Sequence, residues 1–195
     1  NNSSTSFLGV TPTVGNKILP KLTFPKNKKI ISLISTINLN KLTKITKNKN
    51  IVRAIPLPPI EINKGPIILC PPNKSAKNFF KKLGLVIEIG KENLSYKFWA
   101  TASIMAAFYE LLNVSSSWLI KKGIKRKISN QYISELFLAL SQDAFLKKNQ
   151  GFKKLVIDSQ TPKGLNEQVL KNLKKDKFFS KFIKALESIN RRVGK

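Results

Sequence analysis

Three short segments rich in Pro and hydroxyl residues stand where apolar runs of the sequence stop. Val10, Thr11 and Pro12 follow the first run, Ser35 ends the second, and Pro56 follows the third. Ligands of open α/β sheets bind outside the carboxyl ends of the strands. If the runs are neighbouring strands, these segments gather at one edge of a sheet and predict a ligand site there.

Two later segments could bind an anion or orient a polar ligand. Thr101 and Ser103 lie two residues apart within a long apolar stretch, although such hydroxyls can instead bond back to carbonyls of their own helix. Near residues 160–167, a Pro and a Gly precede a predicted helix. The backbone N–H groups around Gly164, Leu165 and Asn166 suit a carboxylate there, and the alternative is an ordinary capped turn.

The composition excludes several kinds of catalytic site. The chain has no His, one Cys and ten acidic residues, so His-based triads, His metal sites and an internal disulfide are ruled out. The nine Gly residues never take the spacing G-x-G-x-x-G, and neither a Walker loop nor a zinc spacing occurs. We therefore predict no metal site, and we expect Cys70 to be a buried apolar residue.

The net charge of +26 comes from 36 Lys and Arg against 10 Asp and Glu. Only four of the 36 are Arg, and the Lys residues are scattered over almost the whole chain, as a genome rich in AT codons would produce. Nucleic-acid readers typically combine Arg forks with aromatic residues on one stripe. We favour solvated Lys faces, and a nucleic-acid surface stays open as the alternative.

The first 90 residues alternate short apolar runs with helix-length segments, which is typical of a doubly wound α/β sheet with buried parallel strands. The predicted strands are 7–10, 30–34, 51–55, 66–69 and 85–89. The predicted helices are 14–22, 39–45 with Asn38 as its N-cap, and 75–83 with Ser75 as its N-cap. The fold class is therefore α/β, with a partial Rossmann-like sheet over residues 1–90.

Residues 91–195 are predicted to form an all-helical domain. The expected helices are 92–113, continued or followed by 114–122, then 129–147, 152–157, a helix opened by Gly164, and 178–193. Residues 98–120 have the length of a membrane span, but Glu110 and a polar stretch interrupt them, so a helix buried on several sides is preferred. Its large apolar surface predicts a homodimer. The first residues form no signal peptide, and we expect a cytoplasmic protein.

In their order and spacing, six segments together resemble the pyrroline-5-carboxylate reductase family. "FLGVTPTV" is similar to the family's "LAVKP", "IISLISTINLNKL" to "ISIAAGI" and "IVRAIPLPP" to "VVRxMPNTP". "ATASIMAAFYELL" lies where the family has "LSGSGPAYVF", "GIKR" where it has "GLPR", and "TPKGLNEQVL" where it has "SPGGTTIxGL". The resemblance spans roughly residues 7–192 and departs at several positions, for example at Lys163, where the family has Gly.

The resemblance implies hydride transfer from NADP or NAD to the C=N carbon of a cyclic imine, which forms proline. It implies a dinucleotide-binding domain followed by a dimerisation domain, in a homodimer or larger homo-oligomer without membrane partners. Val10, Thr11, Pro12, Ser35 and Pro56 would border the cofactor. Thr101, Ser103, Gly164, Leu165 and Asn166 would position the substrate. The family's Gly-rich first βαβ unit has no counterpart here, so an inactive oligomerisation module is the alternative.

Overall fold

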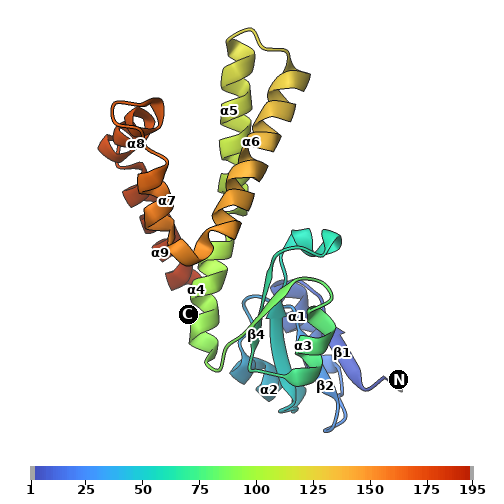
Figure 1. The fold of residues 1–195 in the computed structure, drawn as a ribbon. Coiled ribbons are helices and arrows are strands. Elements are labelled where there is room, and N and C mark those ends of the chain that lie inside the picture. Colours follow the sequence, from blue (N-terminus) through green and yellow to red (C-terminus); the bar gives the residue numbers. More distant parts are fainter. Residues whose placement is uncertain (1–2, 194–195) are drawn as a thin grey trace. The chain divides into compact units, whose positions relative to one another are not determined.

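The structure is a computed structural model that describes residues 3–193 of the chain. Its contacts divide the chain into two compact units (Figure 1). The first unit is Asn1–Ala102 together with Ile189–Lys195, and the second is Ser103–Ser188. The sequence-based boundary near residue 90 follows the last strand, whereas the division by contacts follows the next helix.

The first unit contains a five-stranded sheet in the order β1-β2-β3-β4-β5. Pairing is parallel between β1 and β2, β2 and β3, and β4 and β5, and antiparallel between β3 and β4. The predicted strands are confirmed with small shifts of their ends. Their bounds are Thr5–Leu8 for β1, Lys29–Ser32 for β2, Ile51–Ile55 for β3, Pro66–Cys70 for β4 and Leu85–Glu88 for β5.

Helices cover both faces of this sheet, as the doubly wound prediction requires. Leu19 and Leu42 pack on one face with Ile30 and Ile51, whereas the other face has its own cluster around Phe80. Neighbouring residues of β2 and β3 point to opposite faces that are both covered, so most residues of these two strands are buried. The helices are α1 (Pro12–Ile18), η1 (Leu19–Lys21), α2 (Leu39–Thr46), η2 (Pro58–Ile62), α3 (Lys74–Phe80) and α4 (Glu92–Ala102).

One predicted helix cap is confirmed and one is wrong. Asn38 caps α2, and its side-chain oxygen accepts a hydrogen bond of 2.8 Å from the N–H of Lys41. The cap of α3 is Asn73 rather than Ser75, because the Asn73 side chain accepts from the Ala76 N–H at 3.0 Å. Asn73 stands three residues before that N–H, which is the distance that an N-cap side chain spans.

The second unit is helical throughout. Its helices are α5 (Met105–Lys121), α6 (Arg126–Leu146), η3 (Lys148–Gln150), α7 (Phe152–Asp158), α8 (Leu165–Lys175) and α9 (Phe178–Val193), of which α9 ends within the first unit. The prediction of one long helix from residue 92 to 113 is wrong, because α4 stops at Ala102 and α5 starts at Met105. The Thr101 hydroxyl bonds back to the Lys97 carbonyl just before this break, a contact that often bends helices.

The helical unit has almost no apolar interior of its own. Among its described residues, Ile133 is the buried hydrophobic side chain, while Trp118, Phe145 and Leu146 are 59%, 64% and 78% exposed. A buried contact between α5 and α6 is polar, because the hydroxyls of Ser116 and Ser129 lie 2.8 Å apart. The helix predicted to be buried on several sides is therefore largely exposed within a single chain.

Two further sequence predictions can be compared with the described residues. Cys70 is buried at the end of β4, as predicted. No helix within residues 3–193 is long and apolar enough to cross a membrane.

Candidate active site

The carboxyl ends of β1, β2 and β3 lie along one edge of the sheet, because these three neighbouring strands run parallel. Val10, Thr11 and Pro12 leave β1, Ser35 lies three residues past β2, and Pro56 follows β3 directly. The structure therefore brings the five residues predicted to border a cofactor to the same sheet edge. Thr11 and Ser35 are exposed there, and the other three are half-buried.

The segment that follows β1 packs closely against the segment that follows β2. The Leu33 N–H donates to the Leu8 carbonyl at 3.0 Å, which continues the pairing of β1 and β2 past the strand ends. Helix α1 then approaches the segment after β2 through Gly15. A Cβ atom on Gly15 would lie 3.0 Å from Cδ1 of Ile34 and 3.6 Å from Cγ2 of Val10. A side chain at this position would therefore press against Ile34 and force it to shift by a few tenths of an ångström.

Thr11 has a structural role at the same edge. It is the N-cap of α1, and its hydroxyl oxygen accepts a hydrogen bond of 3.4 Å from the Val14 N–H. The bond is long, and a hydroxyl has a second lone pair and a proton for other partners. Thr11 can therefore cap the helix and still contact a ligand.

A buried guanidinium links β3 to the segment after β2 and to α4. Arg53, in the middle of β3, is 1% exposed and forms an ion pair with Glu92 at the start of α4. Its Nη2 donates to the carbonyl oxygens of Ile34, at 3.0 Å, and of Ser35. The Glu92 carboxylate also accepts from the Leu39 N–H, at 2.9 Å and 3.1 Å for its two oxygens. One ion pair thus joins β3, the end of β2, α2 and α4.

Aromatic and sulfur groups surround this pair. The Arg53 guanidinium lies 4.4 Å from the centre of the Trp99 ring, and the Tyr96 ring packs against Trp99 with centres 5.3 Å apart. Burial raises the pKa of the Cys70 thiol above its usual value, and the nearby Glu92 charge adds to this. Burial likewise raises the pKa of Tyr96. Both groups therefore lose their protons at a higher pH than they would in an exposed position.

The sequence interpretation did not include Arg53 and Glu92 among the site residues. The signal for Arg53 was present, since a charged residue in the apolar run "IVRAI" must find a partner if that run is a buried strand. Nothing in the sequence identified Glu92 as that partner, because the two residues are 39 positions apart.

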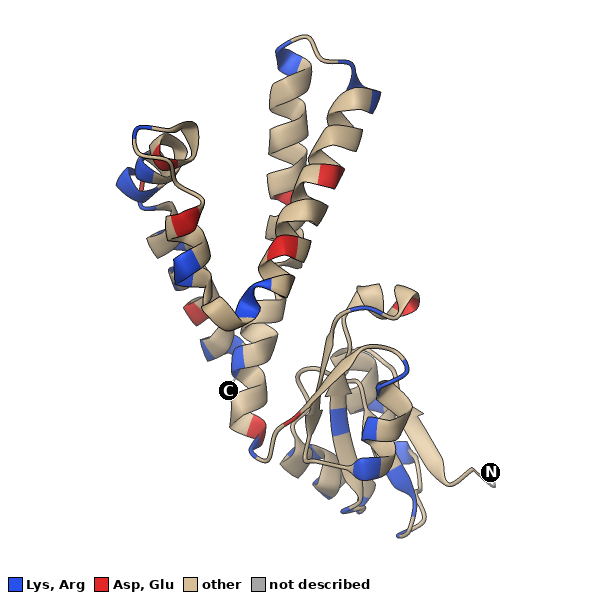
Figure 2. Ribbon diagram, viewed as in Figure 1, with Lys and Arg blue, Asp and Glu red and all other residues tan. Residues whose placement is uncertain are grey.

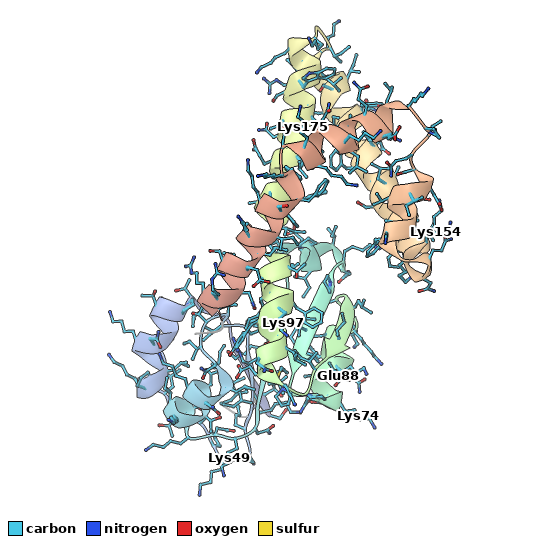
Figure 3. The ribbon with its side chains drawn as sticks, turned by 90° about the vertical axis from the view of Figure 1, so that its left-hand side faces the viewer. Lys49, Lys74, Glu88, Lys97, Lys154 and Lys175 are labelled. Atoms are coloured by element: carbon cyan, nitrogen blue, oxygen red, sulfur yellow. The ribbon has the colours of Figure 1, made fainter. Side chains whose placement is uncertain are left out.

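Thr101 lies near the end of α4, within the first unit. Its hydroxyl donates to the carbonyl of Lys97, one turn earlier, at 2.9 Å (Lys97 is labelled in Figure 3). The bond back to the helix, which sequence reasoning left as an alternative, is therefore present for Thr101. Ser103 is the first residue of the second unit.

The turn before α8 combines a strained residue with exposed backbone. Lys163 has a φ of 61°, in the left-handed region that favours glycine, and Gly164 is the N-cap of α8 without a side-chain cap. Leu165 is 81% exposed, and the Asn166 side chain donates to the Ser159 carbonyl at 2.9 Å. The site residues predicted in this turn thus lie together at the start of one helix.

A carboxylate of the chain itself already contacts this turn. Glu167 accepts a hydrogen bond of 2.6 Å from the Lys163 N–H and pairs with Lys171 at 2.8 Å. The hydrogen bond from the Lys171 side chain, followed by that from the Lys163 backbone, lowers the pKa of Glu167. Glu167 thus places a negative charge at the Lys163 N–H of this turn, and binding of a substrate carboxylate by the N–H groups around Gly164, Leu165 and Asn166 stays a prediction.

The predicted site residues fall into two groups. The five residues at the sheet edge and Thr101 belong to the first unit, whereas Ser103, Gly164, Leu165 and Asn166 belong to the second. Within each unit the residues are placed as described above. That the two groups converge on one crevice stays a prediction.

Comparison with known proteins identifies the family. A family model of pyrroline-5-carboxylate reductase dimerisation matches residues 94–195, which is just over half of the chain. The chain belongs to the pyrroline-5-carboxylate reductase family. No curated protein matches the chain.

Solved structures of the same family share the fold. The pyrroline carboxylate reductase of Plasmodium falciparum, solved with NADP bound, is 21% identical with a TM-score of 0.84, and the match covers 98% of this chain and 76% of that one. The Coxiella burnetii enzyme is 23% identical, with a TM-score of 0.78 and coverage of 98% and 75%. The Streptococcus pyogenes enzyme is 18% identical, with a TM-score of 0.85 and coverage of 97% and 75%. The predicted fold class, a Rossmann-like α/β sheet followed by a helical dimerisation region, is confirmed.

Proposed function

We propose that this chain acts in a pyrroline-5-carboxylate reductase, which reduces a cyclic imine with NADP or NAD as cofactor and serves proline biosynthesis. The observation that carries the proposal is the match of residues 94–195 to the family's dimerisation region. The sheet edge at the carboxyl ends of the parallel strands β1, β2 and β3 also supports the proposal, since such folds bind nucleotides at this edge. A cytoplasmic location stays a prediction.

The residues at the sheet edge fit the nicotinamide half of such a cofactor. The half-buried Val10, Pro12 and Pro56 offer apolar contacts to a flat ring, while Thr11 and Ser35 offer accessible hydroxyls. A bound reduced nicotinamide supplies the hydride. The pyrophosphate of a dinucleotide binds at a Gly-rich turn with the spacing G-x-G-x-x-G before a helix. The Gly residues of this chain never have that spacing, so these residues offer no such site for the pyrophosphate.

Thr101 and the turn before α8 would hold the substrate. The Thr101 hydroxyl donates its proton to the Lys97 carbonyl, which leaves its lone pairs free to accept from the N–H of a protonated imine. The backbone N–H groups after Gly164 would receive the substrate carboxylate. Hydride transfer to a protonated imine needs orientation and a dry pocket rather than a general base, which suits a chain without His.

A turnover assay tests this function directly. Because the residues of this chain offer no Gly-rich site for the pyrophosphate, the assay uses the complete protein. We expect it to oxidise NADPH when pyrroline-5-carboxylate is present, and its Thr101→Ala variant to lose about tenfold in kcat/KM through one missing hydrogen bond. Ser115→Ala is a matched control, because the Ser115 hydroxyl also bonds back to its own helix, at 2.7 Å from the Leu111 carbonyl. Equal activity of the two variants would argue against a role of Thr101.

We also propose a homodimer built through the helical unit. Many of its large apolar side chains, including Trp118, Phe145 and Leu146, are exposed in the single chain, which is typical of a surface that is covered in an oligomer. Since oligomers of identical chains are mostly symmetric dimers, a second copy is the expected partner. Sedimentation at micromolar concentration should give twice the chain mass, and a stable monomer would contradict the proposal.

A second candidate is an oligomerisation module of the same family without catalytic activity. The contact of Glu167 with the Lys163 N–H favours it, because the chain's own carboxylate competes with a substrate carboxylate for this turn. Glu167→Gln removes that negative charge. If wild type and Glu167→Gln both form dimers but neither oxidises NADPH with pyrroline-5-carboxylate, this second candidate is supported and the reductase proposal fails.

Charge alone does not define a nucleic-acid surface. Figure 2 shows Lys and Arg on helices and loops of both units rather than on one element. We therefore do not propose nucleic-acid binding.

A further inference from the structure

The Arg53 guanidinium lies where the two sets of proposed ligand contacts meet within the first unit. On one side it donates to the carbonyl of Ser35, which belongs to the proposed cofactor edge. On the other side it pairs with Glu92 and lies against Trp99, both on α4, which carries Thr101 near its end. Arg53 is 1% exposed, and the hydrogen bonds described for its guanidinium are to carbonyl and carboxylate groups of the chain itself.

These contacts constrain α4 at two points two turns apart. Glu92, at the first residue of α4, is held by Arg53 and by the Leu39 N–H. Trp99 lies seven residues further, with the guanidinium 4.4 Å from its ring centre. A helix fixed at both points can neither rotate nor slide along the sheet without breaking one of the contacts. The position of Thr101, two residues after Trp99, is therefore tied to this cluster.

Stability alone does not explain an ion pair in this place. Two apolar side chains of similar size often stabilise a buried position as well as an ion pair does, or better. A planar guanidinium, however, fixes several acceptors at once in defined directions. Here the acceptors are the carbonyls of Ile34 and Ser35 and the carboxylate of Glu92.

We propose that Arg53 and Glu92 are positioning residues, which hold α4 and thereby Thr101 in register with the sheet edge at Ser35. The kinetic part of this inference rests on the proposed reductase function, whereas the structural part does not. Neither residue touches the reacting atoms. They fix the distance between the Thr101 hydroxyl, which would bind the imine, and the sheet edge at Ser35, which would bind the nicotinamide.

The kinetic test replaces both residues, so that no unpaired charge is left in the core. The variant Arg53→Met/Glu92→Met should fold with a melting temperature near that of the wild type. We expect its kcat to fall up to about tenfold, because displacing Thr101 can cost at most what the loss of its hydrogen bond costs. KM for the imine should change by less than about threefold, because the uniform binding contacts remain.

A matched control removes a second ion pair of the same unit. Lys77 on α3 pairs with Glu88 on β5 at 2.7 Å, and Glu88 is labelled in Figure 3. Lys77→Met/Glu88→Met should leave kcat unchanged, since neither residue contacts the proposed site. Arg53→Lys keeps the charge but loses the planar fork, and its kcat should also fall. A folded Arg53→Met/Glu92→Met variant with wild-type kcat would overturn the inference.

A distance measurement tests the position of α4 without any turnover. Lys49, just before β3, and Lys97 on α4 are exposed residues of the first unit, and Figure 3 labels both. Spin labels on Cys residues at these two positions, in a Cys70→Ala background, should give one narrow distance distribution. We expect the distribution to broaden or shift in Arg53→Met/Glu92→Met and to stay unchanged in Lys77→Met/Glu88→Met.

The two readouts separate the possible failures. If the wild type oxidises no NADPH with the imine, the proposed function fails, and the spin-label distances still decide whether the pair positions α4. Identical distances in wild type and Arg53→Met/Glu92→Met would refute the positioning role. A changed distance together with unchanged kcat in an active enzyme would refute its link to Thr101.

Discussion

Removal of Glu92 alone should destabilise the first unit far more than removal of both partners. In Glu92→Ala the Arg53 guanidinium, 1% exposed, stays in the core without its carboxylate, and the Leu39 N–H loses its acceptor. Breaking a buried pair in this way costs about 3–5 kcal/mol. This is a large share of the roughly 5–15 kcal/mol that keeps a domain folded.

Urea unfolding followed by Trp99 fluorescence measures this loss. In a Trp118→Phe background Trp99 is the remaining Trp, so the signal reports the first unit. With a urea dependence of roughly 2 kcal/mol per molar, the midpoint should fall by about 2 M. The control Lys77→Ala breaks a half-exposed pair and should cost less than about 1 kcal/mol. A loss below about 1 kcal/mol for Glu92→Ala would refute the assigned burial and pairing.

Three other changes have defined outcomes. Gly15→Ala should lower the free energy of unfolding by about 1–3 kcal/mol in the same urea assay, because its Cβ would lie 3.0 Å from Ile34. Trp118→Asp should convert the expected dimer to monomers in sedimentation. Because burial raises the pKa of Cys70, the unfolded thiol ionises first, so this group's contribution to stability should be constant below pH about 8.5 and should decrease as the pH rises further. Urea midpoints of wild type and Cys70→Ala at several pH values check this, and a parallel pH dependence would contradict it.

Much of the first unit follows from local sequence patterns. The runs at 30–34 and 51–55 are apolar without alternation, which is typical of strands covered on both faces, and both are strands of the sheet. Asn38 could be recognised as a cap because cap signals lie within a few residues of the helix start. The antiparallel pairing of β3 and β4 could not be recognised, since pairing direction depends on contacts between distant residues.

The candidate site was predictable to the same degree. The sheet-edge residues follow from strand ends, so Thr11, Ser35 and Pro56 could be named from the sequence. The break between α4 and α5 was missed, because neither Gly nor Pro marks it and the apolar residues Ile104 and Met105 follow directly. The pairing of Arg53 with Glu92 was missed because it joins two elements far apart in the chain.

The exposed apolar surface of the helical unit should make its thermal stability depend on protein concentration. Helices that find their hydrophobic contacts on a second molecule gain or lose them by mass action. We therefore expect the temperature at which these helices melt to rise with the amount of protein in the sample. Melting temperatures measured over a dilution series would show this dependence, and a melting temperature that does not change with concentration would contradict it.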